Sequence, residues 1–187
     1  FGTGASDEIA FEATSLGARR VLIVTDAGVA ATGHPARIAG QLEAAGCEVA
    51  VFDGVHVEPT DESMHAAIDW ASAAGPFDAI VAVGGGSSID TAKAVNLLTT
   101  NDGSLEEYLN APVGAGRAPA KPLLPLIAVP TTTGTGSEST TICVLDVLAL
   151  KVKTGISHAW LRPTVAVVDP QRIEHSRGGA RVIVLEH

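Results

Sequence analysis

Short apolar runs alternate with alanine-rich segments along this chain. The runs at 21–25 and 79–83 are apolar at nearly every position, which is typical of parallel strands buried on both faces. In the alanine-rich segments apolar residues recur at helical spacing, and glycine, proline or a hydroxylated residue stands near the ends. The pattern predicts strands at 21–25, 48–52, 79–83, 126–129, 140–145, 151–156 and 164–168, and helices at 6–16, 35–45, 60–71 and 87–100.

This order of elements predicts an α/β fold. Because strand–helix–strand crossovers are right-handed, the natural assembly is a Rossmann-like, doubly wound parallel sheet with flanking helices. Ligands of such sheets bind beyond the carboxyl ends of the strands, where the loops 84–87 and 131–135 would both lie. The sequence therefore predicts a ligand site at that edge of the sheet.

The loop after the strand at 79–83 is suited to phosphate. It opens with three glycines, which lack Cβ atoms and let phosphate oxygens approach the backbone. We expect Ser87 or Ser88 to cap the following helix, whose N-terminal N–H groups and dipole would face a pyrophosphate. Asp90, in the first turn, is a further contact to the loop or the cofactor; a flexible turn is the alternative for the whole segment. The candidate cofactor residues here are Gly84, Gly85, Gly86, Ser87 and Asp90.

The loop after the strand at 126–129 combines hydroxyls with glycine. Pro130 ends the strand, and threonine and serine hydroxyls then sit among two glycines up to Ser137. Such an arrangement can surround a phosphate or a nicotinamide ribose, although a solvated turn with local hydrogen bonds fits the pattern equally well. The candidate cofactor residues are Thr131, Thr132 and Thr135.

Asp26 follows the first strand and is the candidate for the adenosine ribose. A carboxylate at the end of a strand can accept both ribose hydroxyls, and it would repel the extra phosphate of NADP. The alternative is an Asx turn, because Asp26 precedes Ala27 and Gly28. Asp26 lies before the glycine loop, whereas the acidic residue of the usual dinucleotide fingerprint follows that loop by about 20 residues. The domain is therefore not an ordinary Rossmann unit.

The two loops, in this order, resemble those of a known family. The sequence GGGSSIDTAKAV at 84–95, followed by PTTTGTGSE at 130–138, resembles the iron-containing (group III) alcohol dehydrogenases, and the resemblance covers roughly residues 1–170. Within the family, 57–61 and 151–157 look most like the hydroxyacid–oxoacid transhydrogenase branch. The resemblance implies a single dinucleotide-binding domain at 1–170, with the fold of the N-terminal domain shared with dehydroquinate synthase.

The resemblance also implies cofactors and substrates. Family members transfer a hydride between a nicotinamide cofactor and an alcohol or 2-hydroxy acid, so we expect NAD, with NADP less favoured, and a small-molecule substrate. The family has a lysine near the cofactor after the second loop, for which Lys151 and Lys153 are candidates and Lys153 is preferred. Both lysines would share one face of a strand. Solvated strand lysines are the alternative.

The metal site of the family has no counterpart in this sequence. In the family, an aspartate and three histidines of a C-terminal helical domain bind iron or zinc, the first two in a Gly-x-Asp-x-x-x-His pattern. Residues 171–187 contain no aspartate and do not resemble the family, so we expect a tail that comes from truncation, an altered reading frame or an expression vector. Asp61 and His65 imitate the ligand spacing, but a helix start and an exposed histidine explain them better. We assign no metal ligand and no catalytic residue.

The composition of the chain excludes some classes of function. The 187 residues carry a net charge of −9, which argues against a nucleic-acid partner or an anionic membrane surface. Hydrophobic residues make up 46% of the chain and aromatic residues only 4%, so the core must be aliphatic. Cys47 and Cys143 lack metal or redox spacing and are expected to be small buried hydrophobes. We expect a cytoplasmic protein in which the absent second domain exposes apolar surface and favours a homo-oligomer.

Three functions fit these observations. The first is an oxidoreductase of this family in truncated form. The second is a catalytically inactive dinucleotide-binding fragment, and the third is a structural or regulatory domain that binds another phosphate compound. The resemblance favours the first, while the missing metal ligands leave open whether this chain alone is an active enzyme.

Overall fold

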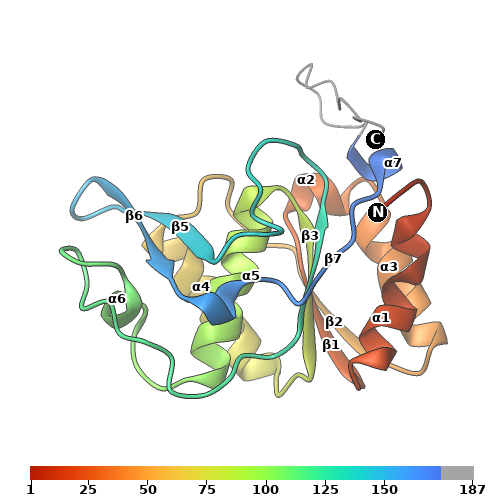
Figure 1. Cartoon of the computed structure of the whole chain (residues 1–187), viewed down its shortest axis with the longest axis horizontal. Coiled ribbons are helices and arrows are strands. Elements are labelled where there is room, and N and C mark those ends of the chain that lie inside the picture. The colour runs from red at the N-terminus through yellow and green to blue at the C-terminus, as the bar shows by residue number, and fades with distance from the viewer. Residues whose placement is uncertain (174–187) are drawn as a thin grey trace.

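The computed structural model describes residues 1–173, so the expectation for the tail at 171–187 concerns mostly residues outside the described part. Its main sheet has five strands in the order β2-β1-β3-β4-β7, and all neighbours are parallel (Figure 1). The strands are β1 (Arg20–Val24), β2 (Glu48–Phe52), β3 (Ala79–Gly84), β4 (Leu126–Pro130) and β7 (Val165–Ala166). This sheet confirms the predicted doubly wound α/β fold.

Helices cover both faces of the sheet (Figure 1). One face carries α1 (Ile9–Ser15) and α3 (His34–Ala44), and the other carries α4 (Asp61–Ala74) and α5 (Gly86–Thr100). The shorter helices are α2 (Ala27–Ala30), α6 (Leu105–Tyr108), α7 (Pro170–Ile173) and the 3-10 turns Ala5–Glu8 and Ala159–Leu161.

The central strands divide the core into two layers, because successive strand residues point to opposite faces. In β3, Ile80 and Ala82 pack with α4 and α5, whereas Val81 and Val83 pack with α1 and α3. This double burial is why the strand sequence is apolar at every position. Cys47 and Cys143 are buried free thiols, as predicted.

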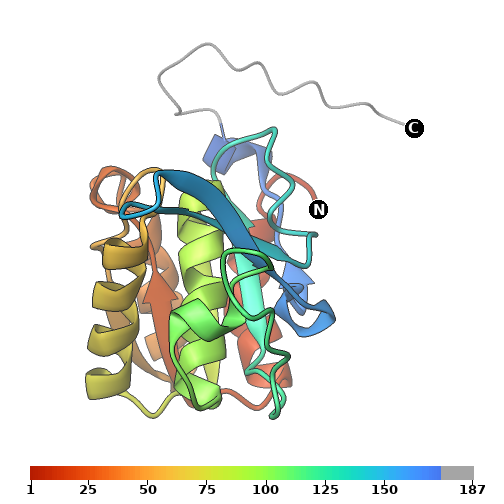
Figure 2. The same cartoon turned by 90° about the vertical axis from the view of Figure 1, so that its left-hand side faces the viewer.

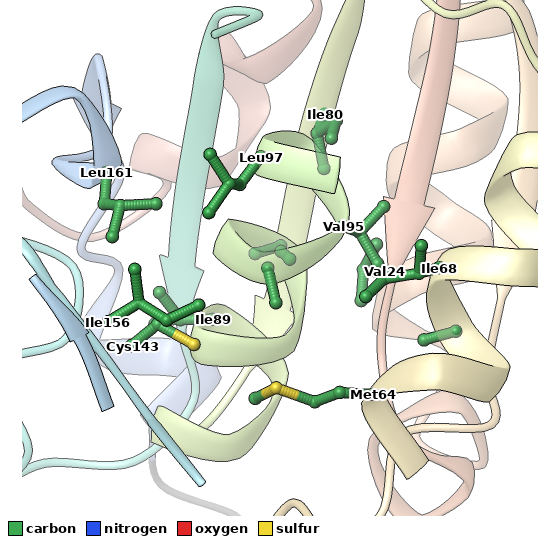
Figure 3. Close-up of a cluster of buried hydrophobic side chains, with 14 of the residues drawn as sticks. Val24, Met64, Ile68, Ile80, Ile89, Val95, Leu97, Cys143, Ile156 and Leu161 are labelled. Atoms are coloured by element: carbon green, nitrogen blue, oxygen red, sulfur yellow. The ribbon is translucent and has the colours of Figure 1, made fainter. Parts of the chain in front are cut away.

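A two-stranded antiparallel hairpin lies on the outer side of α5 (Figure 2). It consists of β5 (Ile142–Val147) and β6 (Val152–Ser157). Cys143 and Ile156 of the hairpin pack against α5 near Ile89 (Figure 3). Because α5 is enclosed between the sheet and the hairpin, every residue from Ser88 to Leu97 is buried, including charged ones.

Most predicted elements are confirmed within two residues at their ends. Thr60 caps α4 as predicted, its Oγ1 accepting the N–H of Ser63 at 3.1 Å. Ser6 does not cap a helix, because its hydroxyl instead donates to the buried Asp169 at 2.7 Å, and α1 begins only at Ile9. None of the described helices is both long and apolar enough to cross a bilayer.

The central position of β3 predicts a large stability loss on truncation there. Ile80 is fully buried between neighbours on β1 and β4, so Ile80→Ala should lower the free energy of unfolding by about 2–5 kcal/mol through lost burial and a cavity. Val51→Ala on the edge strand β2, where the side chain is 41% exposed, is the matched control and should cost under about 1 kcal/mol. Urea unfolding measures both, and equal losses would contradict the layered core.

Candidate functional site

The glycine loop joins β3 to the N-terminus of α5. Gly84 has a φ of 153°, which a side chain rarely tolerates, whereas Gly85 is extended with φ −78° and serves as the N-cap. The predicted cap by Ser87 or Ser88 is wrong, because α5 starts at Gly86 and no side chain caps it. Ser88 donates to Asp26 at 3.2 Å, and the Oγ of Ser87 accepts the N–H of Glu58 at 3.2 Å. The first-turn N–H groups of α5 thus have neither a side-chain cap nor partners within the helix.

The second loop lies directly against the glycine loop. Gly84 and Pro130 are register partners at the ends of β3 and β4, and the N–H of Thr131 donates to the carbonyl of Gly84 at 3.0 Å. A Cβ atom on Gly85 would lie 2.9 Å from Oγ1 of Thr132. One on Gly86 would lie 2.9 Å from Cγ2 of Thr135. Glycine is therefore required here by the neighbouring threonines, and by a positive φ only at Gly84.

Asp26, at the carboxyl end of β1, caps the short helix α2. Its Oδ1 accepts the N–H of Val29 at 3.0 Å and its Oδ2 accepts the hydroxyl of Ser88. The structure thus shows a helix N-cap at Asp26, with a bond to the residue three positions on, where the sequence offered an Asx turn as the alternative. A carboxylate has about four acceptor positions, so these two bonds leave capacity for a ligand.

Two cavities border the pair of loops. The first faces α2 and α3 and is lined by Asp26, Val29, His34, Thr131, Thr132 and Arg172, among others. The second faces the hairpin and is lined by Gly86, Ser87, Asp90, Thr135, Ser137 and Lys153, among others. Gly84 and Gly85 contact residues of the first cavity, since Cβ atoms on them would meet Asp26 and Thr132. All ten residues predicted from the sequence therefore lie at this edge of the sheet.

Ser137, Glu58 and Arg172 are among the lining residues that the sequence did not assign to the site. Ser137 was counted only among the hydroxyls of its loop, and Glu58 only within the family-like segment 57–61. Glu58 has a left-handed φ of 57° that no local pattern signals. The sequence assigns Arg172 to the atypical tail at 171–187, so only the fold shows that it lines the first cavity.

Asp90 and Lys93 form a buried pair on α5. Nζ of Lys93 donates to the carbonyl of Ile142 at 2.7 Å and to Oγ1 of Thr140 at 3.2 Å, and the Lys93 side chain is fully buried. Oδ2 of Asp90 accepts the N–H of Val144 at 3.0 Å. Oδ1 lies 3.5 Å from Nζ and has no hydrogen-bond partner among residues 1–173. The pair ties the helix of the first loop to the strand that follows the second loop.

Burial shifts both members of this pair away from the charged form. It raises the pKa of Asp90, although Lys93 and the N–H of Val144 act against the shift. It lowers the pKa of Lys93, and Asp90 acts against that shift. Each charge therefore depends on the other for its stability inside the protein.

The two candidate lysines do not share a face. Lys151 lies in the turn before β6 with a left-handed φ of 53°, so the predicted strand alternation is wrong for it. Lys153 lies on β6, pairs with Asp146 at 3.3 Å and lines the second cavity. Of the two candidates, Lys153 is therefore the lysine that lies near the loops.

The described residues do not fit a metal of the kind expected for the family. Within residues 1–173, no three His, Cys, Asp or Glu side chains come together as metal ligands. Oδ1 of Asp61 accepts the N–H of Leu148, and Nε2 of His65 contacts Glu106 at 2.6 Å. The spacing of Asp61 and His65 therefore serves structural contacts.

Comparison with known proteins agrees with the fold. The family model described as iron-containing alcohol dehydrogenase matches residues 1–170. The mitochondrial hydroxyacid-oxoacid transhydrogenase of Bos taurus is 43% identical over 176 residues, covering 94% of this chain and 38% of that protein. The Homo sapiens protein of the same name is 42% identical over 177 residues, with the same coverage of both chains. The chain thus spans well under half the length of these relatives.

Solved structures show the same architecture. A 1,3-propanediol oxidoreductase superposes with a TM-score of 0.83 at 34% identity, covering 92% of this chain and 44% of that one. The sulfoacetaldehyde reductase from Bifidobacterium kashiwanohense in complex with NAD+ gives a TM-score of 0.84 at 31% identity, covering 94% and 45%. The cytoplasmic location expected from the sequence is wrong, because the transhydrogenases of Bos taurus and Homo sapiens are named as mitochondrial.

The contact between the loops predicts a specific rescue. Gly85→Ala should cost about 1–3 kcal/mol of stability, since its Cβ would overpack against Thr132 while the backbone angles suit alanine. Thr132→Ala in the Gly85→Ala background should recover most of that loss. Gly40→Ala on α3, where a Cβ meets nothing within 4 Å, is the control and should stabilise by about 0.5–1 kcal/mol. Thermal unfolding of the unaltered chain, Gly85→Ala, Gly85→Ala/Thr132→Ala and Gly40→Ala measures these stability changes. If Thr132→Ala failed to restore stability, the result would show that the two loops are not in contact.

The buried pair predicts a pH-dependent loss. Lys93→Met leaves Asp90 as an uncompensated buried charge and should cost about 3–5 kcal/mol at neutral pH. Because a raised pKa means that the folded state holds the Asp90 proton more tightly than the unfolded chain, this cost should shrink as pH falls through the raised pKa.

Matched variants isolate that charge effect. The double variant Asp90→Asn/Lys93→Met should recover much of the neutral-pH loss. Lys153→Met removes a lysine that is 58% exposed and should cost at most about 1 kcal/mol at any pH. Urea unfolding between pH 4 and pH 8 measures all three; a pH-independent loss in Lys93→Met would contradict an ionised Asp90.

Proposed function

We propose, on the premise that this chain belongs to the iron-containing alcohol dehydrogenase family, that it binds a nicotinamide adenine dinucleotide across the two loops and is the cofactor-binding part of an oxidoreductase. The observation that carries the proposal is the pair of cavities bordering the two loops, of which the second is lined by Gly86 and Ser87 at the N-terminus of α5. A dinucleotide has two nucleoside halves joined by a pyrophosphate, and this arrangement offers two compartments and an anion-binding position at the helix N-terminus.

The first cavity suits the adenosine half. Asp26 retains acceptor capacity for ribose hydroxyls, and Thr131 and Thr132 line the same cavity. At the wall of the second cavity, the first-turn N–H groups at Gly86 and Ser87 and the dipole of the 15-residue helix α5 would hold the pyrophosphate. These local donors matter because the chain as a whole is negatively charged.

The second cavity suits the nicotinamide half. Thr135 and Ser137 offer hydroxyls, Asp90 lines the wall, and Lys153 brings a positive charge. When bound, the nicotinamide supplies hydride transfer to or from a carbon of the substrate. We propose an alcohol or a 2-hydroxy acid as substrate, in keeping with the names of the relatives. The chain's own residues bind and orient the cofactor in this proposal.

A second candidate function is dinucleotide binding without catalysis. It is favoured by one observation, that residues 1–173 bring no three metal ligands together. No step of the proposal runs through a metal for the same reason. Self-association stays a prediction, to which Leu148 and Leu150 at the hairpin turn contribute exposed apolar surface.

Calorimetry on the purified chain tests the proposal. We expect NADH and ADP-ribose to bind with one site each, and inorganic pyrophosphate to bind more weakly because it fills neither cavity. Turnover with alcohols and 2-hydroxy acids in the same samples separates the enzyme from the binding fragment. Tight pyrophosphate binding without any NADH affinity would instead favour a domain for another phosphate compound.

Lys153 provides a residue-level prediction. Lys153→Ala should weaken NADH binding by about three- to tenfold, since an exposed charge facing the cofactor contributes about 1 kcal/mol, and should leave 5′-AMP binding unchanged because Lys153 does not line the first cavity. Lys121→Ala is the matched control, as Lys121 is 60% exposed and pairs with Asp102. Equal losses for NADH and 5′-AMP would remove Lys153 from the nicotinamide side.

A further inference from the structure

Arg172 brings a positive charge into the cavity that also holds Asp26. It lies on α7, two residues beyond the segment matched by the family model, and lines the first cavity with Thr131 and Thr132. Its side chain is only 12% exposed, so the guanidinium is part of the wall.

The guanidinium is held from two sides. Nε donates to the hydroxyl of Ser6 at 3.0 Å and lies 3.7 Å from Oδ2 of Asp169, while Nη1 contacts Nδ1 of His34 at 3.2 Å. Burial acts to raise the pKa of Asp169, but hydrogen bonds from Ser6 and Gln171 outweigh it and keep that carboxyl ionised. These contacts use Nε and Nη1, and Nη2 carries two more N–H donors. Arg172 is thus an oriented and permanently charged donor group.

We propose that Arg172 reads the 2′ position of the adenosine ribose and lets the first cavity accept the 2′-phosphate of NADP, which Asp26 alone would exclude. The inference rests on the proposed function, since it assumes that the adenosine half enters this cavity. A carboxylate at the ribose selects NAD and a nearby arginine accommodates the 2′-phosphate of NADP. This cavity contains both groups, so the chain binds both cofactors.

The chemistry of Asp26 and Arg172 explains why both NAD and NADP would be accepted. A 2′-phosphate would bring up to two negative charges beside Asp26, which is unfavourable in a partly enclosed site. A guanidinium offers a planar pair of donors that match phosphate oxygens and forms charge-assisted hydrogen bonds with them. NAD needs no such partner, because its ribose hydroxyls donate to the carboxylate.

Two small probes test this assignment by calorimetry. In the unaltered chain, 5′-AMP and adenosine 2′,5′-bisphosphate should bind within about tenfold of each other. Arg172→Gln should weaken the bisphosphate by about tenfold or more and 5′-AMP by less than about twofold, because the lost charge-assisted bonds serve only the 2′-phosphate. Arg172→Lys, which keeps the charge but loses the planar donor pair, should lie between. Asp26→Asn, which preserves the helix cap, should shift the preference toward the bisphosphate.

The controls separate selectivity from folding and from the proposed function. Arg162→Gln removes the same charge from a different cavity and should leave both affinities unchanged. An Arg172→Gln variant that loses affinity for both probes equally would reduce Arg172 to a structural role and overturn the inference. An unchanged ratio would overturn it as well. Failure of the unaltered chain to bind 5′-AMP, ADP-ribose and NADH would instead overturn the proposed function.

Discussion

The direct contact between the two loops is the constraint on which the site depends. At Gly85 and Gly86 a single methyl group would overlap the side chains of Thr132 and Thr135, so backbone and threonine side chains meet with no room between them. This closeness is possible because β3 and β4 are neighbours in a parallel sheet and end at the same level. The buried Asp90–Lys93 pair then fixes the far end of the second loop through Thr140, Ile142 and Val144.

Local chemistry explains what could be predicted from the sequence. The strands follow from their unbroken apolar runs, and the cap of α4 follows from Thr60 because its partner, Ser63, is three residues away. The predicted cap at Ser87 or Ser88 failed for the opposite reason. The hydroxyl of Ser88 donates to Asp26, which lies 62 residues earlier in the chain. A local sequence pattern cannot predict a hydrogen bond to so distant a residue.

The sequence predicted which residues form the candidate site but not the cavities that they line. Spacing indicated that Asp26 and the two loops share one edge of the sheet, yet not that they border two cavities with different walls. The hairpin wall depends on how β5 and β6 dock onto α5, and that docking is governed by Cys143, Ile156 and a buried lysine rather than by turn residues. Lys151 and Lys153 show this limit, since Lys151 lies in the turn between the two strands and Lys153 lies on β6, although alternation would have aligned them.

The contacts of Ser6 have a consequence for how the protein is made. Ser6 bonds to Asp169 and Arg172, which lie 163 and 166 residues further along the chain. During synthesis from the N-terminus, β1 and β3 can pair long before these partners leave the ribosome, but the wall formed by Arg172 cannot be in place. Strands β1 to β4 can therefore assemble early from nearby segments, whereas β7 joins the sheet late and the first cavity is completed only when the two ends of the folded unit meet.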